Sequence, residues 1–185
     1  VITTYYDGID TSLYCADLKT ELKDLLASTH TPITYADVLT AFRQTDVSSN
    51  DTIIDRYSVC TYTYTTLSCS GNSAECQCYN RDHVVPQSWF GSWDNYPMYS
   101  DMHHLFPSDG YVNSAKKANL PLGILSSVSY NNGVIKVGSS SATNGYTGDV
   151  FEPSNEYKGD FARAYLYFVT RYQDSITAFV ARNPS

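Results

Sequence analysis

Two short stretches in the middle of the chain hold most of the residues that could do chemistry. The first, NRDHVVPQSWF at 80–90, places Asp82 beside His83 just before an apolar segment. A carboxylate can hold a divalent cation through oxygen, and an imidazole that titrates near neutral pH can take a proton from water. Because Pro86 disfavours a helix here, we expect an extended segment that ends near His83. Taken alone, the pair is equally a surface aspartate beside a hydrogen-bonded histidine.

The second stretch, SDMHHLFPSDGYVNSAKKANLPLG at 100–123, predicts a helix that runs to about Lys117. On that helix Asn113 and Lys117 would share one face. An asparagine amide oxygen is a competent ligand for Mg²⁺ or Ca²⁺, and Lys116 or Lys117 could contact a phosphate. Without further context, the same residues describe a polar helix face.

The second stretch also contains two adjacent histidines, His103 and His104. In an extended segment only one of them can face a site. One could orient His83 or Asp82 from behind, and the other could be a histidine of the core.

The elements that must position these residues follow from periodicity. Helices are predicted at 11–30, 34–46 and 159–183, and a β-branched, aromatic segment at 51–67 predicts extended structure. An Asn-Asn-Gly turn within 128–148 predicts a hairpin. The order of helices, strands, hairpin and helix favours a mixed α+β fold over a parallel α/β sheet.

Composition narrows the class of protein. The 185 residues are enough for one domain, and 42% hydrophobic residues indicate a globular chain. The net charge of -7 argues against nucleic-acid binding by bulk electrostatics, so a polyanionic substrate needs a local basic patch or a bound cation. The longest uncharged stretch is interrupted by Pro, Gly, Ser and Asn, so no membrane span is predicted. The start at Val1 shows no signal peptide, which a cut mature terminus would explain.

Five cysteines are many for a cytosolic domain, and they indicate disulfides formed in an oxidising compartment. The odd number leaves at least one cysteine outside any internal bridge. A pairing of Cys76 with Cys78 is disfavoured by ring strain, but the sequence does not choose among the other pairings. Buried free thiols are the alternative.

In combination, these motifs resemble the endonuclease I family of secreted and periplasmic nucleases, which belong to the ββα-metal (His-Me finger) nucleases. The family pattern reads roughly Asn-Arg-Glu-His-x-x-Pro, then Asp-Leu-His-His/Asn-Leu-x-Pro, then Val-Asn before a basic stretch. The segments 80–86, 101–107 and 112–117 match it in order. The segment 152–172 also resembles the closing helix of the family.

The resemblance implies a fold and an activity. The fold would be a single mixed α+β domain over 1–185, with a ββα-metal core at about 78–120 and flanking helices. The activity would be that of a largely sequence-nonspecific endonuclease that cleaves DNA, with RNA as a second substrate, and leaves 5′-phosphate ends. By the same resemblance His83 is the general base, and Asp82 and Asn113 are catalytic metal ligands of a single Mg²⁺, for which Mn²⁺ or Ca²⁺ could substitute. The protein would be a secreted or periplasmic monomer without membrane contact.

Two departures from the family pattern affect the site. Asp82 stands where the family usually has Glu, and the shorter side chain could replace direct coordination by a water bridge. In addition, 84–100 contains no Lys or Arg, although some relatives place a phosphate-binding Arg there. The remaining candidates for phosphate contact are Arg81, Lys116, Lys117 and Arg163. The residues expected to orient the site from behind are Asp101, His103, His104 and Asn119.

Three other readings compete with the nuclease. A zinc module could draw ligands from Cys76, Cys78 and the histidines, although the spacing matches no common zinc pattern. A Cys-His hydrolase could use Cys78 with His83, which requires a free thiol. Finally, the change of Glu to Asp at Asp82 leaves open a catalytically weakened or inactive relative that serves as a metal-binding structural or adhesive secreted protein.

Overall fold

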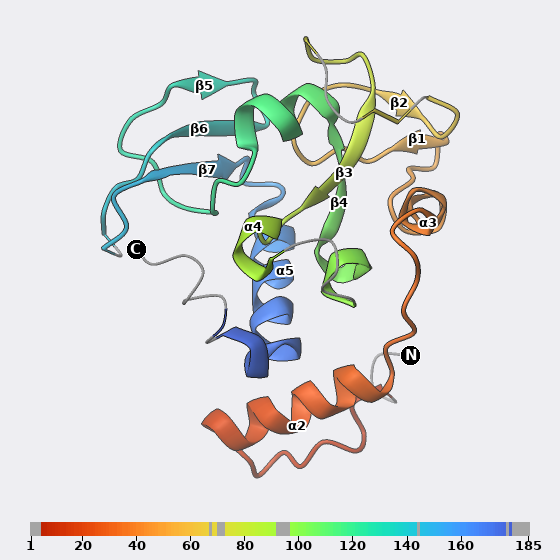
Figure 1. Ribbon diagram of the computed structural model, residues 1–185, viewed down its shortest axis with the longest axis vertical. Helices are drawn as coiled ribbons and strands as arrows, with labels where there is room; N and C mark the ends of the chain where they lie inside the picture. Colours follow the sequence, from red (N-terminus) through yellow and green to blue (C-terminus); the bar gives the residue numbers. More distant parts are fainter. Residues whose placement is uncertain are drawn as a thin grey trace.

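Helices and small antiparallel sheets alternate along the chain, as the sequence predicts for a mixed α+β fold (Figure 1). The computed structural model describes residues 5–66, 68–69, 73–91, 97–143, 145–176 and 178. Within these residues the strands form three sheets, ordered β1-β2, β3-β4 and β5-β6-β7. The helices are α2 (Cys15–Ser28), α3 (Asp37–Thr45), α4 (Gln87–Phe90), the π-helix η3 (Val112–Lys117) and α5 (Lys158–Arg171). The strands are β1 (Thr52–Ile53), β2 (Tyr62–Thr63), β3 (Tyr79–His83), β4 (Leu105–Asp109), β5 (Tyr130–Asn131), β6 (Ile135–Ser139) and β7 (Asp149–Pro153). Short 3₁₀ turns lie at η1 (Met98–Ser100), η2 (Met102–His104) and η4 (Gln173–Ser175).

The predicted extended segment at 51–67 forms less regular structure than its composition suggests. Only β1 and β2 pair there, in a two-residue ladder. The segment instead buries individual side chains, among them Tyr57 between the two strands and Tyr62 in β2. Tertiary packing of these aromatic residues therefore overrides the local strand propensity.

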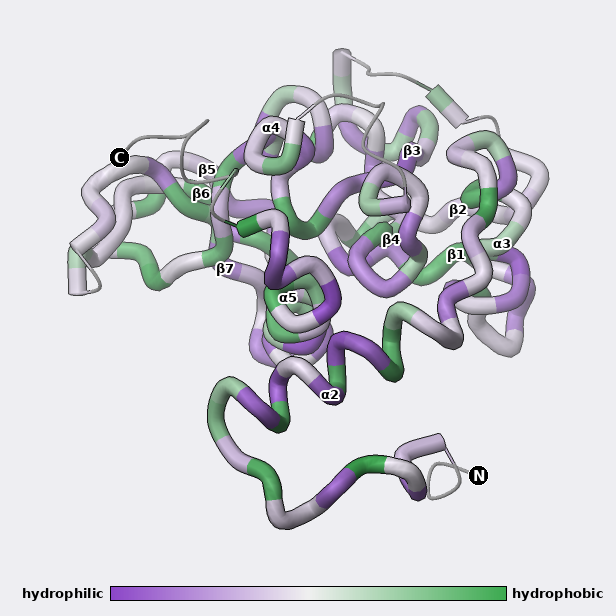
Figure 2. Tube along the Cα trace, turned by 60° about the horizontal axis from the view of Figure 1, so that its bottom comes forward, coloured by the Kyte–Doolittle hydropathy of each residue, from purple (hydrophilic) through white to green (hydrophobic). Residues whose placement is uncertain are grey.

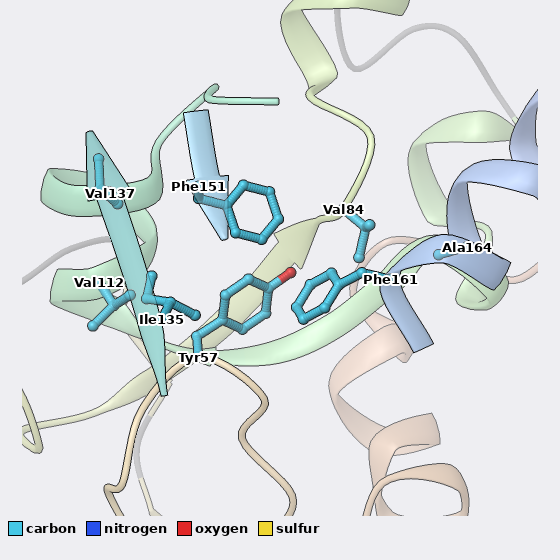
Figure 3. Close-up of a cluster of buried hydrophobic side chains, with 8 residues drawn as sticks. All are labelled: Tyr57, Val84, Val112, Ile135, Val137, Phe151, Phe161 and Ala164. Atoms are coloured by element: carbon cyan, nitrogen blue, oxygen red, sulfur yellow. The ribbon is translucent and has the colours of Figure 1, made fainter. Parts of the chain in front are cut away.

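The largest apolar cluster surrounds Tyr57 and joins the β5-β6-β7 sheet to α5. Figure 3 shows the Tyr57 ring with its hydroxyl pointing between Phe151 and Phe161. The ring centroids of Tyr57 and Phe161 are 5.1 Å apart in an edge-on arrangement, which is favourable for aromatic pairs. This cluster fixes one side of the β3-β4 pair.

The other side of β3-β4 packs against α3 through a second cluster that includes Val38, Phe42 and Leu105. A third cluster packs α4 against α5 through Phe90 and Phe168. The β3-β4 pair is thus enclosed between helices and the three-stranded sheet, which fixes the direction of the side chains that it carries.

Helix α2 lies across the end of α5 at the edge of the molecule (Figure 1). Polar and apolar residues alternate along it (Figure 2), and it has no fully buried residue. Hydrogen bonds join it to η4, including one from Lys23 Nζ to Asp174 Oδ2 at 3.0 Å. In the part of the chain that the structure describes, no helix is long and apolar enough to cross a membrane.

The predicted hairpin turn is present between β5 and β6. Gly133 has a φ of +91°, which a residue with a side chain rarely adopts, and its N–H donates to Asn131 Oδ1 at 2.9 Å. Of the predicted helix at 159–183, α5 and η4 account for the described part, and residues 177 and 179–183 lie outside it.

Two disulfides tie down the segment before β3. They join Cys60 to Cys76 and Cys69 to Cys78, while Cys15 is a free, exposed thiol. The prediction that Cys76 and Cys78 do not pair with each other is confirmed. The second bridge packs closely on Gly110, where an added Cβ would lie 2.5 Å from Cys69 Sγ. Glycine is therefore required at the start of the segment that leads to η3.

Candidate active site

Strands β3 and β4 and helix η3 frame the candidate site. In the antiparallel ladder Asp82 lies opposite Phe106, and His83 lies opposite Leu105. The chain then turns after Asp109 into η3. The order of strand, strand and helix is the one that the sequence resemblance leads us to expect around 78–120.

Asp109 fixes the start of η3. Its Oδ1 accepts hydrogen bonds from the backbone N–H groups of Tyr111 at 2.9 Å and Val112 at 2.8 Å. A carboxylate at this position satisfies donors that have no partner within the helix. Its Oδ2 accepts from the N–H of Cys76 at 2.7 Å and from the hydroxyl of Tyr62. Asp109 therefore links the disulfide-bonded segment to the helix that carries Asn113.

A second buried carboxylate, Asp55, supports Asp109. Its Oδ2 accepts from the N–H of Asp109 at 2.9 Å and from Ser58 Oγ at 2.6 Å, and its Oδ1 accepts from the N–H of Tyr57 at 2.8 Å. Burial raises the pKa of Asp55 to about 7, although these hydrogen bonds oppose the shift. Protonation of Asp55 near neutral pH is thus coupled to the support of η3.

A polar cavity of about 290 Å³ opens between β3 and η3. It brings together Asp82, His83 and Asn113, the three residues that the sequence predicts to converge. The residues that border it are Tyr35, Asn80, Arg81, Asp82, His83, Gln87, Asn113, Ser114, Ala118 and Asn119.

His83 is held in a cage of aromatic rings. Its ring centroid lies 5.7 Å from that of Tyr35 and 5.2 Å from that of Tyr99, both in stacked arrangements. Its Nε2 is 2.9 Å from the carbonyl oxygen of Tyr99. Because a carbonyl only accepts, Nε2 carries the hydrogen, and Nδ1 keeps the lone pair that can take a proton. Burial lowers the pKa of His83 to about 3, with a smaller contribution from the nearby His104, so the imidazole is neutral at pH 7.

Asn113 is oriented by a bond to β3. Its Nδ2 donates to the carbonyl oxygen of Arg81 at 3.1 Å. This bond occupies the amide nitrogen and leaves Oδ1 as the group that can accept or coordinate. An asparagine oxygen beside a neutral histidine suits a hydrated divalent cation next to a proton acceptor.

Lys117 and Asp82 form a buried ion pair behind the cavity. Lys117 is fully buried, and its Nζ lies 2.9 and 2.8 Å from the two oxygens of Asp82 and 2.8 Å from the carbonyl oxygen of His83. The hydroxyl of Tyr57 also donates to Asp82. Lys117 therefore offers no ammonium to a phosphate in this arrangement, which corrects its predicted role. The metal-ligand role of Asp82 stays a prediction, since Asp82 borders the cavity and, among the described residues, its Oδ1 accepts from Lys117 alone.

Asn113 and Lys117 both reach β3 from η3, in keeping with the prediction that they share one helix face. Asn113 Nδ2 donates to the carbonyl oxygen of Arg81 at 3.1 Å, and Lys117 Nζ donates to that of His83 at 2.8 Å. The N–H of Ala118 donates to the carbonyl oxygen of Asn113 at 2.9 Å, five residues back, as in a π-helix. Asn113 borders the cavity, whereas the longer side chain of Lys117 ends in the core beside Asp82.

Of the other predicted cations, only Arg81 borders the cavity. Its guanidinium lies 3.9 Å from the ring centroid of Tyr35, its Nη1 donates to the carbonyl oxygen of Tyr35 at 2.7 Å, and its buried Nε has no hydrogen-bond partner in the described structure. The structure does not bring Lys116 or Arg163 to the cavity. Lys116 Nζ lies about 5 Å from two tyrosine rings, and the exposed Arg163 pairs with Asp160.

The residues predicted to orient the site from behind divide into two groups. Asn119 borders the cavity, and the buried His104 lies with its ring centroid 5.7 Å from that of His83. His104 Nε2 is 2.7 Å from the carbonyl oxygen of Met98. Asp101 and His103 instead bond to each other, with the Nδ1 of His103 3.1 Å from Asp101 Oδ1. They form a separate network next to α5.

Two of the competing readings fail on the cysteines. Cys76 and Cys78 are both in disulfides, so neither supplies a thiolate for zinc or for nucleophilic attack. Among the described residues, no group of three or more His, Cys, Asp or Glu side chains could hold a metal ion. The zinc module and the Cys-His hydrolase are therefore not supported.

Sequence comparison with known proteins identifies the family of this chain. The Endonuclease I family profile matches residues 15–182. The chain belongs to the endonuclease I family. Two similar relatives are each named "Extracellular ribonuclease". The Bacillus subtilis (strain 168) protein is 30% identical over 173 residues, which are 92% of this chain and 54% of the relative. The Bacillus amyloliquefaciens protein is 31% identical over 163 residues, which are 84% of this chain and 49% of the relative. The chain thus spans about half the length of these relatives, and the resemblance predicted from its motifs is confirmed.

For this endonuclease I family member, sequence reasoning missed the aromatic residues of the site. Tyr35 precedes α3 and Tyr99 lies in η1, so both are remote in sequence from the motif of His83. Their only signal is the abundance of tyrosine, with 17 residues. Composition cannot tell which tyrosines reach a site.

The first prediction concerns the Asp82–Lys117 pair. Burial raises the pKa of Asp82 and lowers that of Lys117, and their mutual attraction opposes both shifts. Lys117→Met leaves Asp82 buried without its partner, so we expect the free energy of unfolding in urea to fall by roughly 3–5 kcal/mol. The double variant Asp82→Asn/Lys117→Met removes both charges and should recover most of that loss. A Lys117→Met variant as stable as the wild type would contradict the pairing.

The second prediction concerns Asp55 and pH. Its pKa is raised from 3.8 to about 7 on folding, so its contribution to stability is fully present below pH 3.8 and is lost as the pH rises through 7. Relative to Asp55→Asn, the wild type should lose stability between these pH values by on the order of 1 kcal/mol per pH unit. Urea unfolding of both proteins across this range measures the difference, in which other titrating groups cancel.

The exposed carboxylate Asp149 provides the control for this measurement. Asp149→Asn should show the same pH dependence as the wild type. Equal pH dependence in the wild type and Asp55→Asn would mean that Asp55 does not titrate in this range.

Proposed function

We propose that the chain is a secreted, divalent-metal-dependent endonuclease that hydrolyses phosphodiester bonds in RNA and DNA with little sequence preference. The supporting observation is that a neutral, caged His83 and Asn113 border one polar cavity on the β3-β4-η3 frame. The proposal takes this frame as a ββα-metal core at about 78–120, within a single domain over 1–185. It also places the activity in the part of the relatives that this chain matches.

The names of the two relatives, both "Extracellular ribonuclease", support RNA as a substrate of this chain. The cavity itself offers groups for a phosphate and a metal ion, which RNA and DNA share, so DNA remains a substrate in the proposal. The same names, together with the two disulfides, support secretion into an oxidising environment.

The residues present fit a hydrated Mg²⁺. Nucleases of this family are typically metal-dependent. Mg²⁺ keeps several waters and is bound through few protein oxygens together with substrate phosphates, and the Asn113 amide and the Asp82 carboxylate are the predicted oxygen ligands that border the cavity. Asn113 Oδ1 would hold the ion, for which Mn²⁺ or Ca²⁺ could substitute. When bound, the ion would neutralise charge on a non-bridging phosphate oxygen and on the leaving 3′ oxygen.

His83 would supply the proton transfer. Nδ1 of His83 would accept a proton from water, the water oxygen would attack phosphorus, and the bond from phosphorus to the 3′ oxygen would break, with the 3′ oxygen taking a proton from solvent water. The products are a 5′-phosphate and a 3′-hydroxyl. The stacked rings of Tyr35 and Tyr99 hold the imidazole plane, and the Tyr99 carbonyl fixes the tautomer.

Arg81 would bind the phosphate. It is the cation that borders the cavity, and its Nε is free of protein partners in the described structure. Asp82 and Lys117 would act behind the site by tying β3 to η3. With one arginine at the cavity and a net charge of -7, binding should depend on the metal ion and only weakly on salt.

The third prediction tests the two roles directly. His83→Ala should lower the rate of plasmid and RNA digestion in Mg²⁺ at least roughly a hundredfold, because it removes the general base. Asn113→Ala should weaken Mg²⁺ binding in calorimetry at least about tenfold, because it removes the amide oxygen proposed to hold the ion. EDTA should abolish digestion by all of the proteins.

Lys116→Met serves as the matched control, since Lys116 does not border the cavity and should leave digestion unchanged. Near-wild-type digestion by His83→Ala would refute the assignment of the base. No Mg²⁺-dependent digestion by the wild type would favour the inactive, structural alternative.

The fourth prediction distinguishes water from the ribose as the nucleophile. If His83 activates water, RNA whose 2′-hydroxyls are methylated should still be cleaved, and its fragments should carry 5′-phosphates. Gel analysis of end-labelled RNA before and after phosphatase treatment measures both. Fragments with 2′,3′-cyclic phosphates, or complete resistance of the methylated RNA, would show that the 2′-hydroxyl attacks instead.

A further inference from the structure

A second cavity, of about 310 Å³, lies between the end of α2, η2 and α5 and is not used by the proposed chemistry. This volume is at the lower end of the range for small-molecule sites, roughly 300–1,000 Å³. Apolar and aromatic side chains make up much of its lining, with hydroxyl groups and imidazoles between them. Its lining includes Ile33, Ser100, Asp101, His103 and Tyr167.

An exposed aromatic platform stands at this cavity. The rings of His103 and Tyr167 stack with centroids 4.4 Å apart and an angle of 18° between their planes. The side chain of His103 is 65% exposed, so one ring of the stack is open to solvent. Such a surface can receive another planar ring.

Asp101 holds the platform rigid from below. Its buried carboxylate accepts from the Tyr167 hydroxyl at 2.8 Å, from the Tyr172 hydroxyl at 2.6 Å, and from the backbone N–H of His103 at 3.0 Å. The bond between Asp101 and the His103 ring raises the pKa of His103, which favours a cationic ring at the rim. Both rings are therefore fixed before any ligand arrives, which lowers the entropic cost of binding.

The two cavities share a wall. Ser100 Oγ donates to the carbonyl oxygen of Ile33 at 2.6 Å on the side of the second cavity. On the side of the candidate active site lie Tyr35, two residues after Ile33, and Tyr99, the residue before Ser100; their ring centroids are 4.2 Å apart, and both rings stack with that of His83. The two cavities are therefore lined by neighbouring residues of the same two segments.

We propose that the second cavity is a subsite for a nucleobase of the single-stranded substrate, which stacks on the His103–Tyr167 platform while a phosphate of the same strand lies at His83. The inference rests on the proposed nuclease function. It answers a difficulty of that function, since an acidic chain with one arginine at its active site cannot hold a strand by charge. Base stacking contributes affinity that does not depend on positive charge or on sequence.

Binding without catalysis provides the test. A short single-stranded oligoribonucleotide is titrated into His83→Ala in Mg²⁺, with binding read before any residual cleavage, and the titration is repeated with one base at a time replaced by an abasic residue. We expect one position at which loss of the base weakens binding about tenfold, as for a lost stacking contact. Adding Tyr167→Leu or His103→Ala should weaken binding of the intact strand by a similar factor and abolish the effect of the abasic residue.

Two further variants make the outcome decisive. Tyr167→Phe keeps the ring and loses only its bond to Asp101, so it should weaken binding less than Tyr167→Leu does, which separates stacking from the bond to Asp101. Tyr14→Leu changes an exposed tyrosine that borders neither cavity, and it should also have no effect. The proposal is overturned if no position responds to base removal, or if His103→Ala and Tyr167→Leu bind the strand unchanged. Because cleavage is not measured, failure of the nuclease assignment would not alter this result.

Discussion

The buried ion pair between Asp82 and Lys117 is the interaction on which the site depends. It joins the last turn of η3 to β3, and Lys117 also bonds to the carbonyl oxygen of His83. Charges buried this deeply are tolerated only when each finds a partner, so strand and helix can pack in one register. That register lets Asn113 Nδ2 donate to the carbonyl oxygen of Arg81, with Asn113 at the border of the cavity. The Asp82–Lys117 pair on the inner side and the polar residues that border the cavity on the outer side therefore depend on the same packing of η3 on β3.

The residues around the cavity carry little charge and include several aromatic side chains. His83 is neutral and enclosed by Tyr35 and Tyr99, and Arg81 stacks on the first of these tyrosines. Low polarity around an imidazole keeps it unprotonated, while the ring contacts fix its orientation at little entropic cost. Under the proposed function, a site of this kind would take most of its positive charge from a bound cation and would hold the substrate through ring contacts.

The sequence motifs predicted the α+β class and the convergence of His83 and Asn113, because these properties depend on ordered spacing along the chain. The inward position of Lys117 could not be read in the same way. It depends on the pairing of the ammonium group with Asp82 on β3, a contact between two elements that nothing in the local sequence of η3 indicates. Tyr35 and Tyr99 reach His83 only through tertiary packing, so their roles also lie beyond pattern reasoning.

The contact between Gly110 and the Cys69–Cys78 bridge has a consequence for where the enzyme can work. Gly110 adjoins Asp109, which starts η3, and its N–H donates to the carbonyl oxygen of Cys78. The sulfur atoms are therefore part of the surface against which the catalytic helix is seated. Formation of this disulfide and seating of η3 are therefore coupled by packing. Under the proposed function, a chain whose cysteines are still reduced would lack part of the frame of its active site, and its nuclease activity would follow oxidation.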